Sequence, residues 1–371
     1  MGSAGMKRRS LDEVKALGQE EAVEIMRQAG ILGAGGGGFP TYFKYRDPQP
    51  RLIVNANESE PGYWADKVMH KEHFDAFLQV YEALKDVFGF EQVTMCIHEK
   101  DLEWYADYDK HSGEGVYDVR CVPDKYALGE EKALIREITD TKVPRKVETS
   151  DGSERQGMPL DVGIIVNNSE TLFNVYNALF LGRPVTTKTL SVYGEDVEDL
   201  KVYEVPIGAS MTEVLRVAGM DVENSAHLSV IDGGPYLNEI GIEQLGNEDG
   251  YVRQTTNALL LIPRGTKSKD YAGVETEPPE EGIVSLVGEV SGARIPLGGR
   301  YLEPAEALVS VGDEVEYGQK IGEPTDEGFS IGVWASVGGT LSSIEDDIVA
   351  IDGGGPSQQD AEAEAEAEAS R

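Results

Sequence analysis

The run Gly33-Ala34-Gly35-Gly36-Gly37-Gly38, followed by Phe39-Pro40-Thr41, decides how the rest of this sequence is interpreted. Its five glycines tolerate positive φ angles and let the backbone approach a ligand closely. Successive exposed N–H groups of such a loop form a nest for phosphate oxygens. The run is no Walker loop, because Gly-Lys-Ser/Thr is missing, and it precedes Phe-Pro-Thr where a dinucleotide fingerprint would begin a helix. A flexible hinge is the alternative, against which the apolar Phe-Pro-Thr argues. We interpret the run as a phosphate-binding loop.

The segments around this glycine loop alternate between helix and strand patterns. Ser10 and Glu13 form a capping box that begins a helix, and Gly30 is placed to end it. Beyond the loop, strand patterns at 51–56, 92–98, 117–122 and 162–166 alternate with helix patterns at 66–88, 129–139 and 170–181, and the composition of 147–157 predicts a polar loop. This alternation predicts an α/β, Rossmann-like domain over residues 10–185.

The pattern changes after residue 187. Short β segments with one helix, at 211–218, predict a small α+β domain over residues 186–265. Short strands separated by glycines predict an all-β domain over residues 280–352. The Ala/Asp/Glu repeat in residues 353–371 predicts a disordered acidic tail.

The charge of the chain restricts its partners. It has 371 residues, of which 67 are acidic and 33 basic, giving a formal net charge of −34. Nucleic acid is excluded as a partner, because phosphate neutralisation needs a face rich in Lys and Arg. The stretch 360–368 holds only five of the acids, so the excess is spread over the folded part. Such a surface favours a halophilic protein, whose self-repulsion is screened by a salty cytosol.

The cysteine count and the hydropathy pattern give further expectations. Cys96 and Cys121 are too few for an iron–sulfur cluster held within this chain, and both lie in apolar stretches that predict buried core positions. Five histidines argue against a multi-histidine metal site. Without a long apolar run or an apolar segment after Lys7, Arg8 and Arg9, we expect a cytoplasmic protein with no direct membrane insertion.

Three polar clusters follow predicted strands. They are Asn55-Ala-Asn57-Glu58, Tyr126-Ala-Leu-Gly129-Glu130-Glu131 and Asn167-Asn168-Ser-Glu170-Thr171. Ligands of open α/β sheets bind outside the carboxyl ends of the strands. Asn amides both donate and accept, which suits the edge of a flavin ring, and carboxylates suit ribose hydroxyls. Lys44 supplies positive charge for an anionic cofactor. Each cluster alone could be ordinary loop and cap residues, but all of them with the glycine loop predict a cofactor site.

In their order along the chain, the glycine loop and the three clusters resemble motifs of the flavin subunit of respiratory complex I. The same family includes the Rnf complex C subunit and the microcompartment cobalamin reductase, and the resemblance covers about residues 25–350. It implies that NAD(H), as substrate, stacks over bound FMN. The residues that would contact FMN are Gly33, Gly35, Lys44, Asn55, Asn57, Glu58, Tyr126, Gly129, Val166, Asn167, Asn168 and Thr171. Phe39, Glu130 and Glu131 would contact NAD(H), and no side chain is expected as a catalytic nucleophile or general base.

The resemblance extends to the later domains. It implies a soluble-ligand-binding β-grasp domain, with Asp232-Gly233-Gly234-Pro235 in its expected place, followed by a barrel-sandwich hybrid domain. The chain departs from the family in lacking the cysteine clusters that accept electrons from the flavin, and in having Asn57 where complex I has Asp.

The function implied is that of an electron-transfer flavoprotein subunit. It would pass electrons from NADH through FMN to a partner subunit that holds iron–sulfur centres or another acceptor. Two alternatives stay open. One is a non-catalytic assembly subunit, and the other is a protein that binds a soluble ligand such as a corrinoid.

Overall fold

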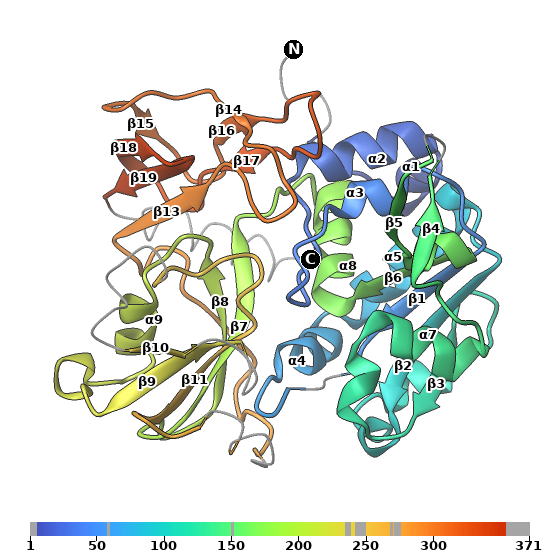
Figure 1. Ribbon diagram of the computed structural model, residues 1–371, viewed down its shortest axis with the longest axis horizontal. Coiled ribbons are helices and arrows are strands. Elements are labelled where there is room, and N and C mark those ends of the chain that lie inside the picture. The colour runs from blue at the N-terminus through green and yellow to red at the C-terminus, as the bar shows by residue number, and fades with distance from the viewer. Residues whose placement is uncertain are drawn as a thin grey trace.

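The structure is a computed structural model that describes residues 6–57, 60–149, 152–233, 239–241, 250–267, 270 and 276–353. Figure 1 shows a helix-rich part on one side and two β-rich parts on the other. Gly234 and Pro235 of the predicted ligand-binding motif, and the predicted acidic tail from residue 354 onward, lie outside the described residues.

A four-stranded parallel sheet organises the first part. Its strands are β1 (Arg51–Asn55), β2 (Gln92–His98), β3 (Asp118–Val122) and β6 (Ile164–Asn168), in the order β3-β2-β1-β6. The chain builds outward from β1 to β3 and then returns to pair β6 with the other side of β1. The strand order therefore reverses between β1 and β6, and such a switch point is where parallel sheets open a crevice for ligands. The predicted α/β class is confirmed.

Helices cover both faces of this sheet. Leu52 and Val54 of β1 pack into a core that includes α5 (Phe74–Phe88) and α8 (Ser169–Tyr176). Ile53 points to the opposite face, into a core shared with α7 (Glu131–Thr139). A strand buried on both faces requires the continuous apolar run that the sequence shows here.

The first predicted helix is in fact two. The capping box is present, since Ser10 N donates to Glu13 Oε2 at 2.8 Å and Glu13 N donates to Ser10 Oγ at 3.3 Å. The helix α1 (Leu11–Lys15) then stops, and α2 (Gln19–Gln28) begins after Gly18, whose backbone is extended. Glycine has low helix propensity, so a break there costs little.

The predicted helix over 66–88 is also divided. It forms α4 (Ala65–Glu72) and α5, separated at His73, which has φ −116° and ψ 35°. The His73 ring stacks on Phe173 with centroids 4.4 Å apart. The break turns α4 away from α5 and onto strands of the second sheet.

Three further details correct or complete the first part. Segment 147–157, predicted as a polar loop, contributes to a hairpin of β4 (Lys146–Glu148) and β5 (Glu154–Gln156). Cys96 is buried as predicted, whereas Cys121 is exposed at the edge strand β3. The first part also contains the short helices α3 (Thr41–Lys44) and α6 (Ala106–Lys110).

Within the described part of the chain, no helix combines the length and apolar character needed to cross a membrane.

A mixed six-stranded sheet follows, in the order β10-β9-β11-β7-β8-β12. Its strands are β7 (Thr187–Gly194), β8 (Lys201–Pro206), β9 (Leu228–Asp232), β10 (Glu239–Gly241), β11 (Ala258–Pro263) and β12 (Ile283–Ser285), and α9 (Met211–Val217) connects β8 to β9. The strand β12 lies beside β8, although its residues fall within the range predicted for the all-β domain. The sheet and α9 agree with the predicted α+β character.

The last part consists of strands and turns in the residues described. One sheet has the order β13-β19-β18-β15 and the other β14-β16-β17. The strands are β13 (Gly292–Pro296), β14 (Glu306–Ala307), β15 (Glu314–Val315), β16 (Lys320–Glu323), β17 (Val333–Trp334), β18 (Gly339–Glu345) and β19 (Ile348–Asp352). Its apolar core is continuous with that of the six-stranded sheet, joining for example Leu190 and Leu215 to Ile295 and Ile351.

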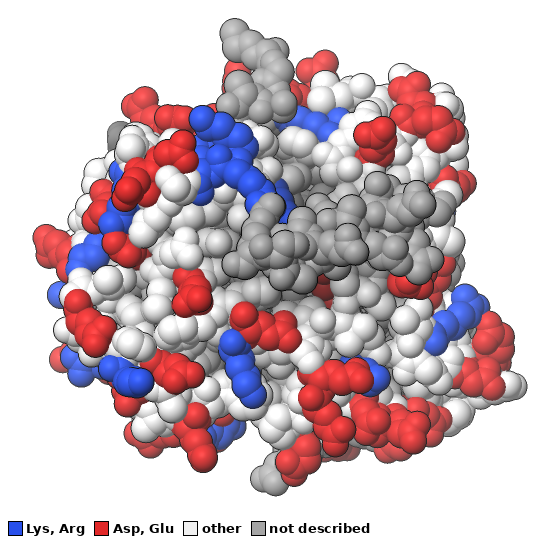
Figure 2. All heavy atoms as spheres, turned by 180° about the vertical axis from the view of Figure 1, so that it is seen from behind, with Lys and Arg blue, Asp and Glu red and all other residues white. Residues whose placement is uncertain are grey.

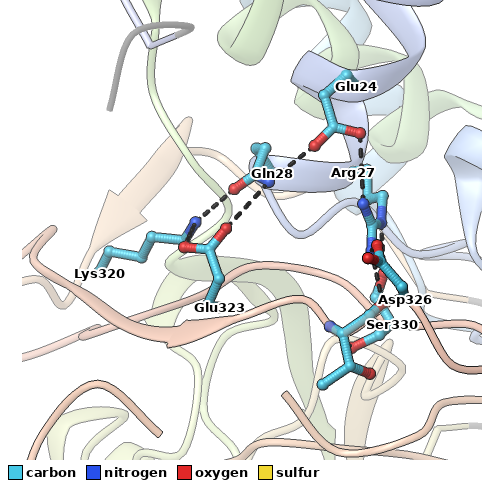
Figure 3. A network of polar contacts seen from close by, with 8 residues as sticks. Glu24, Arg27, Gln28, Lys320, Glu323, Asp326 and Ser330 are labelled. Atoms are coloured by element: carbon cyan, nitrogen blue, oxygen red, sulfur yellow. Dashed lines mark hydrogen bonds and ion pairs between the residues drawn. The ribbon is translucent and has the colours of Figure 1, made fainter. Parts of the chain in front are cut away.

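Figure 3 shows how the last part binds the end of α2. Arg27 Nε donates to Ser330 O at 3.2 Å, and Gln28 Nε2 donates to Glu323 at 3.3 Å. In return, Gly332 N donates to Arg27 O at 3.0 Å and Trp334 Nε1 donates to Gln28 O at 2.8 Å. The last part therefore supplies N–H donors to carbonyls at the C-terminus of α2.

The surface carries acidic side chains widely rather than in one patch. On the face drawn in Figure 2, Asp and Glu side chains are spread widely, and Lys and Arg side chains gather in one region. Because the chain has 67 acids and 33 bases, many acids have no cation of their own, and the folded state holds together against its own repulsion.

We therefore expect thermal stability to depend on salt. Between about 0.1 M and 2 M KCl the Debye length falls from ~10 Å to below ~3 Å, and the melting temperature should rise steadily, by at least about 5 °C. Differential scanning calorimetry in KCl, with an osmotically matched sucrose series as the control, measures this. A melting temperature indifferent to KCl, or equally raised by sucrose, would contradict the electrostatic explanation.

Candidate functional site

The glycine loop folds back on itself and leaves three N–H groups free. Gly33 N donates to Phe39 O at 2.8 Å, and Gly38 N donates to Gly33 O at 3.0 Å. Gly36 and Gly38 have φ angles of +94° and +63°, where a side chain would be strained. Among the described residues, the N–H groups of residues 35–37 find no acceptor, and these three glycines are exposed. Consecutive free N–H groups of this kind make an anion nest.

The start of α8 holds this loop in place. Ala34 N donates to Thr171 Oγ1 at 2.9 Å, and Thr171 N donates to Asn168 Oδ1 at 3.0 Å, which caps α8. A Cβ atom at position 35 would lie 3.2 Å from Asn168 Cβ, so the backbone of Gly35 runs directly against this side chain. Only glycine fits there without displacing Asn168.

The switch point of the sheet brings the three polar clusters together. Asn55 at the end of β1 is the register partner of Asn168 at the end of β6. Asn55 Nδ2 donates to Gly129 O at 2.9 Å, and Asn57 Nδ2 donates to Asn55 Oδ1 at 3.0 Å. Residues from three separate segments thus form one connected group beside the glycine loop.

Lys44 connects the second and third clusters. Its Nζ donates to Val166 O at 2.8 Å and pairs with Glu131 Oε1 at 3.0 Å, while its side chain is only 11% exposed. This places one nearly buried positive charge at the edge of the group. A cation held there would offset part of the charge of an anionic ligand.

Unpaired buried amide oxygens show that this group has unused acceptors. In the residues described, the Oδ1 atoms of Asn57, Asn167 and Asn257 are buried and accept no hydrogen bond. Asn167 Nδ2, in contrast, is satisfied by Tyr45 Oη at 2.6 Å. A buried polar atom without a partner costs free energy, and a ligand with an N–H group removes that cost. A flavin mononucleotide fits both features, because its ring carries an imide N–H and its phosphate matches the nest.

Phe39, predicted to contact NAD(H), packs against other aromatic rings of the chain. Its ring makes edge contacts with Phe43, at 5.8 Å between centroids, and with Tyr301 and Phe329 of the last part, at 5.7 Å and 5.6 Å. Aromatic rings at these separations attract one another. The side chain predicted to meet the nicotinamide nucleotide is therefore already in contact with the last part of the chain.

Of the other predicted residues, Glu130 and Tyr126 lie in the segment that precedes and begins α7. Glu130 caps α7 by accepting from Ala133 N at 2.9 Å. Tyr126 is 51% exposed and donates to Glu60, whose pKa is raised by burial. Glu58 lies outside the described residues.

Two residues of the second part face the loop and were not predicted from the sequence. A Cβ atom on Gly38 would lie 3.2 Å from Thr255 Cγ2, and one on Gly36 would lie 3.7 Å from Asn257 Nδ2. Neither Thr255 nor Asn257 belongs to a recognisable motif. Only the unpaired amide oxygen of Asn257, which needs the structure to be seen, singles it out.

Comparison with known families confirms the resemblance. Residues 26–177 match the Nuo51 FMN-binding domain, and residues 284–357 match the RnfC barrel sandwich hybrid domain. Two separate regions of the chain are therefore similar to domains of these two families.

Curated relatives are oxidoreductases. Cobalamin reductase PduS of Salmonella typhimurium is 29% identical over 249 residues, which cover 67% of this chain and 51% of the relative. The C subunit of the ion-translocating oxidoreductase complex of Haemophilus influenzae is 26% identical over 260 residues, which cover 69% of this chain and 30% of the relative. The chain spans about half or less of the length of these relatives.

A solved structure shares the fold. The NAD+-reducing NiFe-hydrogenase in the air-oxidised state superposes with a TM-score of 0.55 and 21% identity, covering 72% of this chain and 49% of the hydrogenase chain. At this level of identity the likeness shows the fold alone.

A buried ionic cluster lies directly behind the Asn167–Asn168 segment. Glu170 forms an ion pair with Lys188 of β7 and accepts from Thr189 N at 2.8 Å. Asp66 of α4 is buried beside them and accepts from Tyr63 Oη at 3.2 Å. The cluster therefore joins α4 and α8 to the second sheet at the place where the site is built.

Burial raises the pKa of the Asp66 carboxyl to about 7, and the nearby Glu170 carboxylate adds to this rise while Lys188 opposes it. An acid whose pKa is raised on folding binds more protons in the folded state. Its ionisation therefore destabilises the fold, beginning above the unfolded pKa near ~4 and complete above ~7.

We expect Asp66→Asn to remove this pH dependence. The free energy of unfolding of the wild type, relative to that of the variant, should fall between about pH 4 and pH 7 by on the order of 3 kcal/mol. Urea unfolding across this range measures the difference, with the exposed Asp107→Asn as the matched control. If the difference in free energy of unfolding between wild type and Asp66→Asn changes with pH no more than that for Asp107→Asn, the Asp66 charge does not oppose folding.

Proposed function

We propose that this chain is the NADH-oxidising FMN subunit of an electron-transfer complex. The observation that carries the proposal is the free N–H nest of residues 35–37 beside the switch point of a domain that matches the Nuo51 FMN-binding family. Bound FMN supplies the conversion between a two-electron hydride donor and one-electron acceptors. The overall reaction is the oxidation of NADH to NAD+, with release of one proton and transfer of two single electrons to an acceptor.

The chain's own residues would hold and orient the cofactor. The nest would bind the phosphate, and the side chains of Asn55, Asn57 and Asn168 would face the flavin. Thr171 and Asn168 fix the loop to α8, so the nest needs little rearrangement on binding. Lys44, held by Val166 O, would balance part of the added negative charge.

Glu130 and Glu131 support a preference for NADH over NADPH. Each uses one carboxylate oxygen within the fold, Glu130 on Ala133 N and Glu131 on Lys44. Among the described residues, the second oxygen of each makes no hydrogen bond and is free to accept from a ribose hydroxyl. The same carboxylates would repel the 2′-phosphate of NADPH.

The acceptor belongs to a partner subunit in this proposal. The chain supplies only Cys96 and Cys121, which lie on different strands, so we place the iron–sulfur centres in the partner. The similarity to cobalamin reductase makes a corrinoid the other acceptor to test. We infer a cytoplasmic protein that reaches a membrane only through its partner.

One observation favours a second candidate, an assembly subunit that keeps the fold and the flavin without oxidising NADH. Phe39 is in contact with Tyr301 and Phe329, so the last part covers a residue that would serve the nucleotide. A subunit that only organises its partners has no need of a free Phe39.

The two candidates differ in how the bound flavin responds to nucleotide. In anaerobic stopped-flow mixing, NADH should bleach the flavin absorbance about 10- to 100-fold faster than NADPH, because a like-charge clash in a partly buried site costs on the order of 1–3 kcal/mol. Glu130→Gln and Glu131→Gln should each narrow this ratio by speeding NADPH, while leaving the flavin bound.

Bleaching by neither nucleotide would exclude NADH oxidation and leave the assembly role. Equal rates with both nucleotides would show that Glu130 and Glu131 serve only to cap α7 and to pair with Lys44.

A further inference from the structure

The surface beside α7 is richer in cations than this acidic protein as a whole. Two adjoining hollows lie here: one of about 650 Å³ between α7 and segment 140–145, and one of about 410 Å³ between Lys132 of α7 and the β4–β5 hairpin. Lys132, Val143 and Arg145 line both of them. We call this surface the basic hollow. Its cations are Lys132, Arg136, Lys142, Arg145, Lys146 and Arg155.

The charge of the basic hollow is largely uncompensated. Lys146 pairs with Glu154 and Arg155 pairs with Asp161. The remaining four cations form no ion pair with any described residue, and the other acids that line the hollow are Glu137 and Asp140. Six cations against three lining acids is the reverse of the balance in the whole chain, which has twice as many acids as bases.

The basic hollow has an apolar floor. Leu128 and Val143 line it and belong to the core that covers one face of the parallel sheet. Charged stems that lie over an apolar floor can contact a partner through both their methylene groups and their charges. In Figure 1, α7 and the hairpin lie on the side of the first part that faces away from the other two. Every residue that lines the two hollows belongs to the segment 128–156.

The basic hollow also lies next to the candidate cofactor site. Lys132 follows Glu131, whose carboxylate pairs with Lys44 at the edge of that site. The helix α7 has nine residues, or about 13 Å, so its whole length stays close to the place proposed for the flavin.

We propose that the basic hollow is the docking surface for an acidic face of the protein that accepts electrons from the flavin. The proposal rests on the proposed function for the identity of this partner, whereas the charge complementarity is independent of it. Opposite charges raise the rate of encounter between two proteins and orient them. Because the chain as a whole is strongly acidic, a surface with six cations and three lining acids favours the approach of an acidic partner.

A model acidic ligand tests the surface directly. Fluorescently labelled poly-L-glutamate of about 20 residues should bind the full chain at ~20 mM salt, as measured by anisotropy, and should dissociate as salt is raised. The triple variant Lys132→Gln/Arg136→Gln/Arg145→Gln should weaken this binding at least about tenfold. The triple variant Lys100→Gln/Lys201→Gln/Arg216→Gln removes the same charge from exposed positions elsewhere and should change binding less than about threefold.

Three results would overturn the proposal. The first is that the wild type does not bind poly-L-glutamate, and the second is that both triple variants lose affinity for it equally. The third is a tenfold gain in this affinity when the five acids of residues 360–368 are changed to amides. The last result would show that the chain's own acidic segment, and not a partner, occupies the basic hollow.

Electron transfer provides a second readout, separate from NADH. The flavin is first reduced by dithionite. The Lys132→Gln/Arg136→Gln/Arg145→Gln variant should then react more slowly with anionic ferricyanide than the Lys100→Gln/Lys201→Gln/Arg216→Gln variant does. With cationic hexaammineruthenium(III) it should react no more slowly. If no flavin is bound, the proposed function fails while the polyglutamate result still decides the docking surface. Equal changes with both acceptors would show that the hollow does not select its partner by charge.

Discussion

The register between β1 and β6 determines everything that the candidate site contains. Pairing Asn55 with Asn168 places two chain segments more than one hundred residues apart at the same crevice. Asn168 then caps α8, and Thr171 in the first turn of α8 holds the glycine loop through Ala34. A slip of one residue would turn these side chains to the other faces of the sheet and remove the support of the loop. The nest of free N–H groups therefore depends on a strand pairing rather than on the glycines alone.

The first part does not build the site alone. The break at His73 turns α4 toward the second sheet, and the buried Glu170–Lys188 pair joins that sheet to α8. Breaking a buried ion pair by removing one partner is costly, so the two parts are held in one arrangement. The last part binds the end of α2 and reaches Phe39. A site formed by three parts of the chain can respond to a partner that binds any of them, which suits a subunit that works within a complex.

Much of this arrangement could be predicted from the sequence, and the exceptions have physical reasons. The alternation of strands and helices and the glycine loop predicted the α/β domain, because local patterns determine both. The helix breaks at Gly18 and His73 were missed, since the apolar period continues across them and only packing against other elements reveals them. Cys121 was expected to be buried, but β3 is an edge strand, and strand order cannot be read from periodicity. Thr255 and Asn257 reach the loop only through tertiary contact, and no motif marks them. The contact of Phe39 with the last part was likewise visible only in three dimensions, whereas a cap role for Glu130 was an alternative that the sequence had left open.

The central claim is that the glycine loop and the switch point together bind FMN, and its most direct test is the cofactor content of the protein. Purified in high salt and incubated with a mixture of FMN and FAD, the wild type should retain FMN in about equimolar amount, identified by chromatography after heat release. Gly18→Val, where an added Cβ meets no heavy atom within 4 Å on an extended backbone outside the nest, should retain it as well. Gly35→Val, whose Cβ would press on Asn168 at 3.2 Å, should lose it while keeping its fold by circular dichroism. Retention of FAD, no flavin in the wild type, or full FMN content in Gly35→Val would contradict the account.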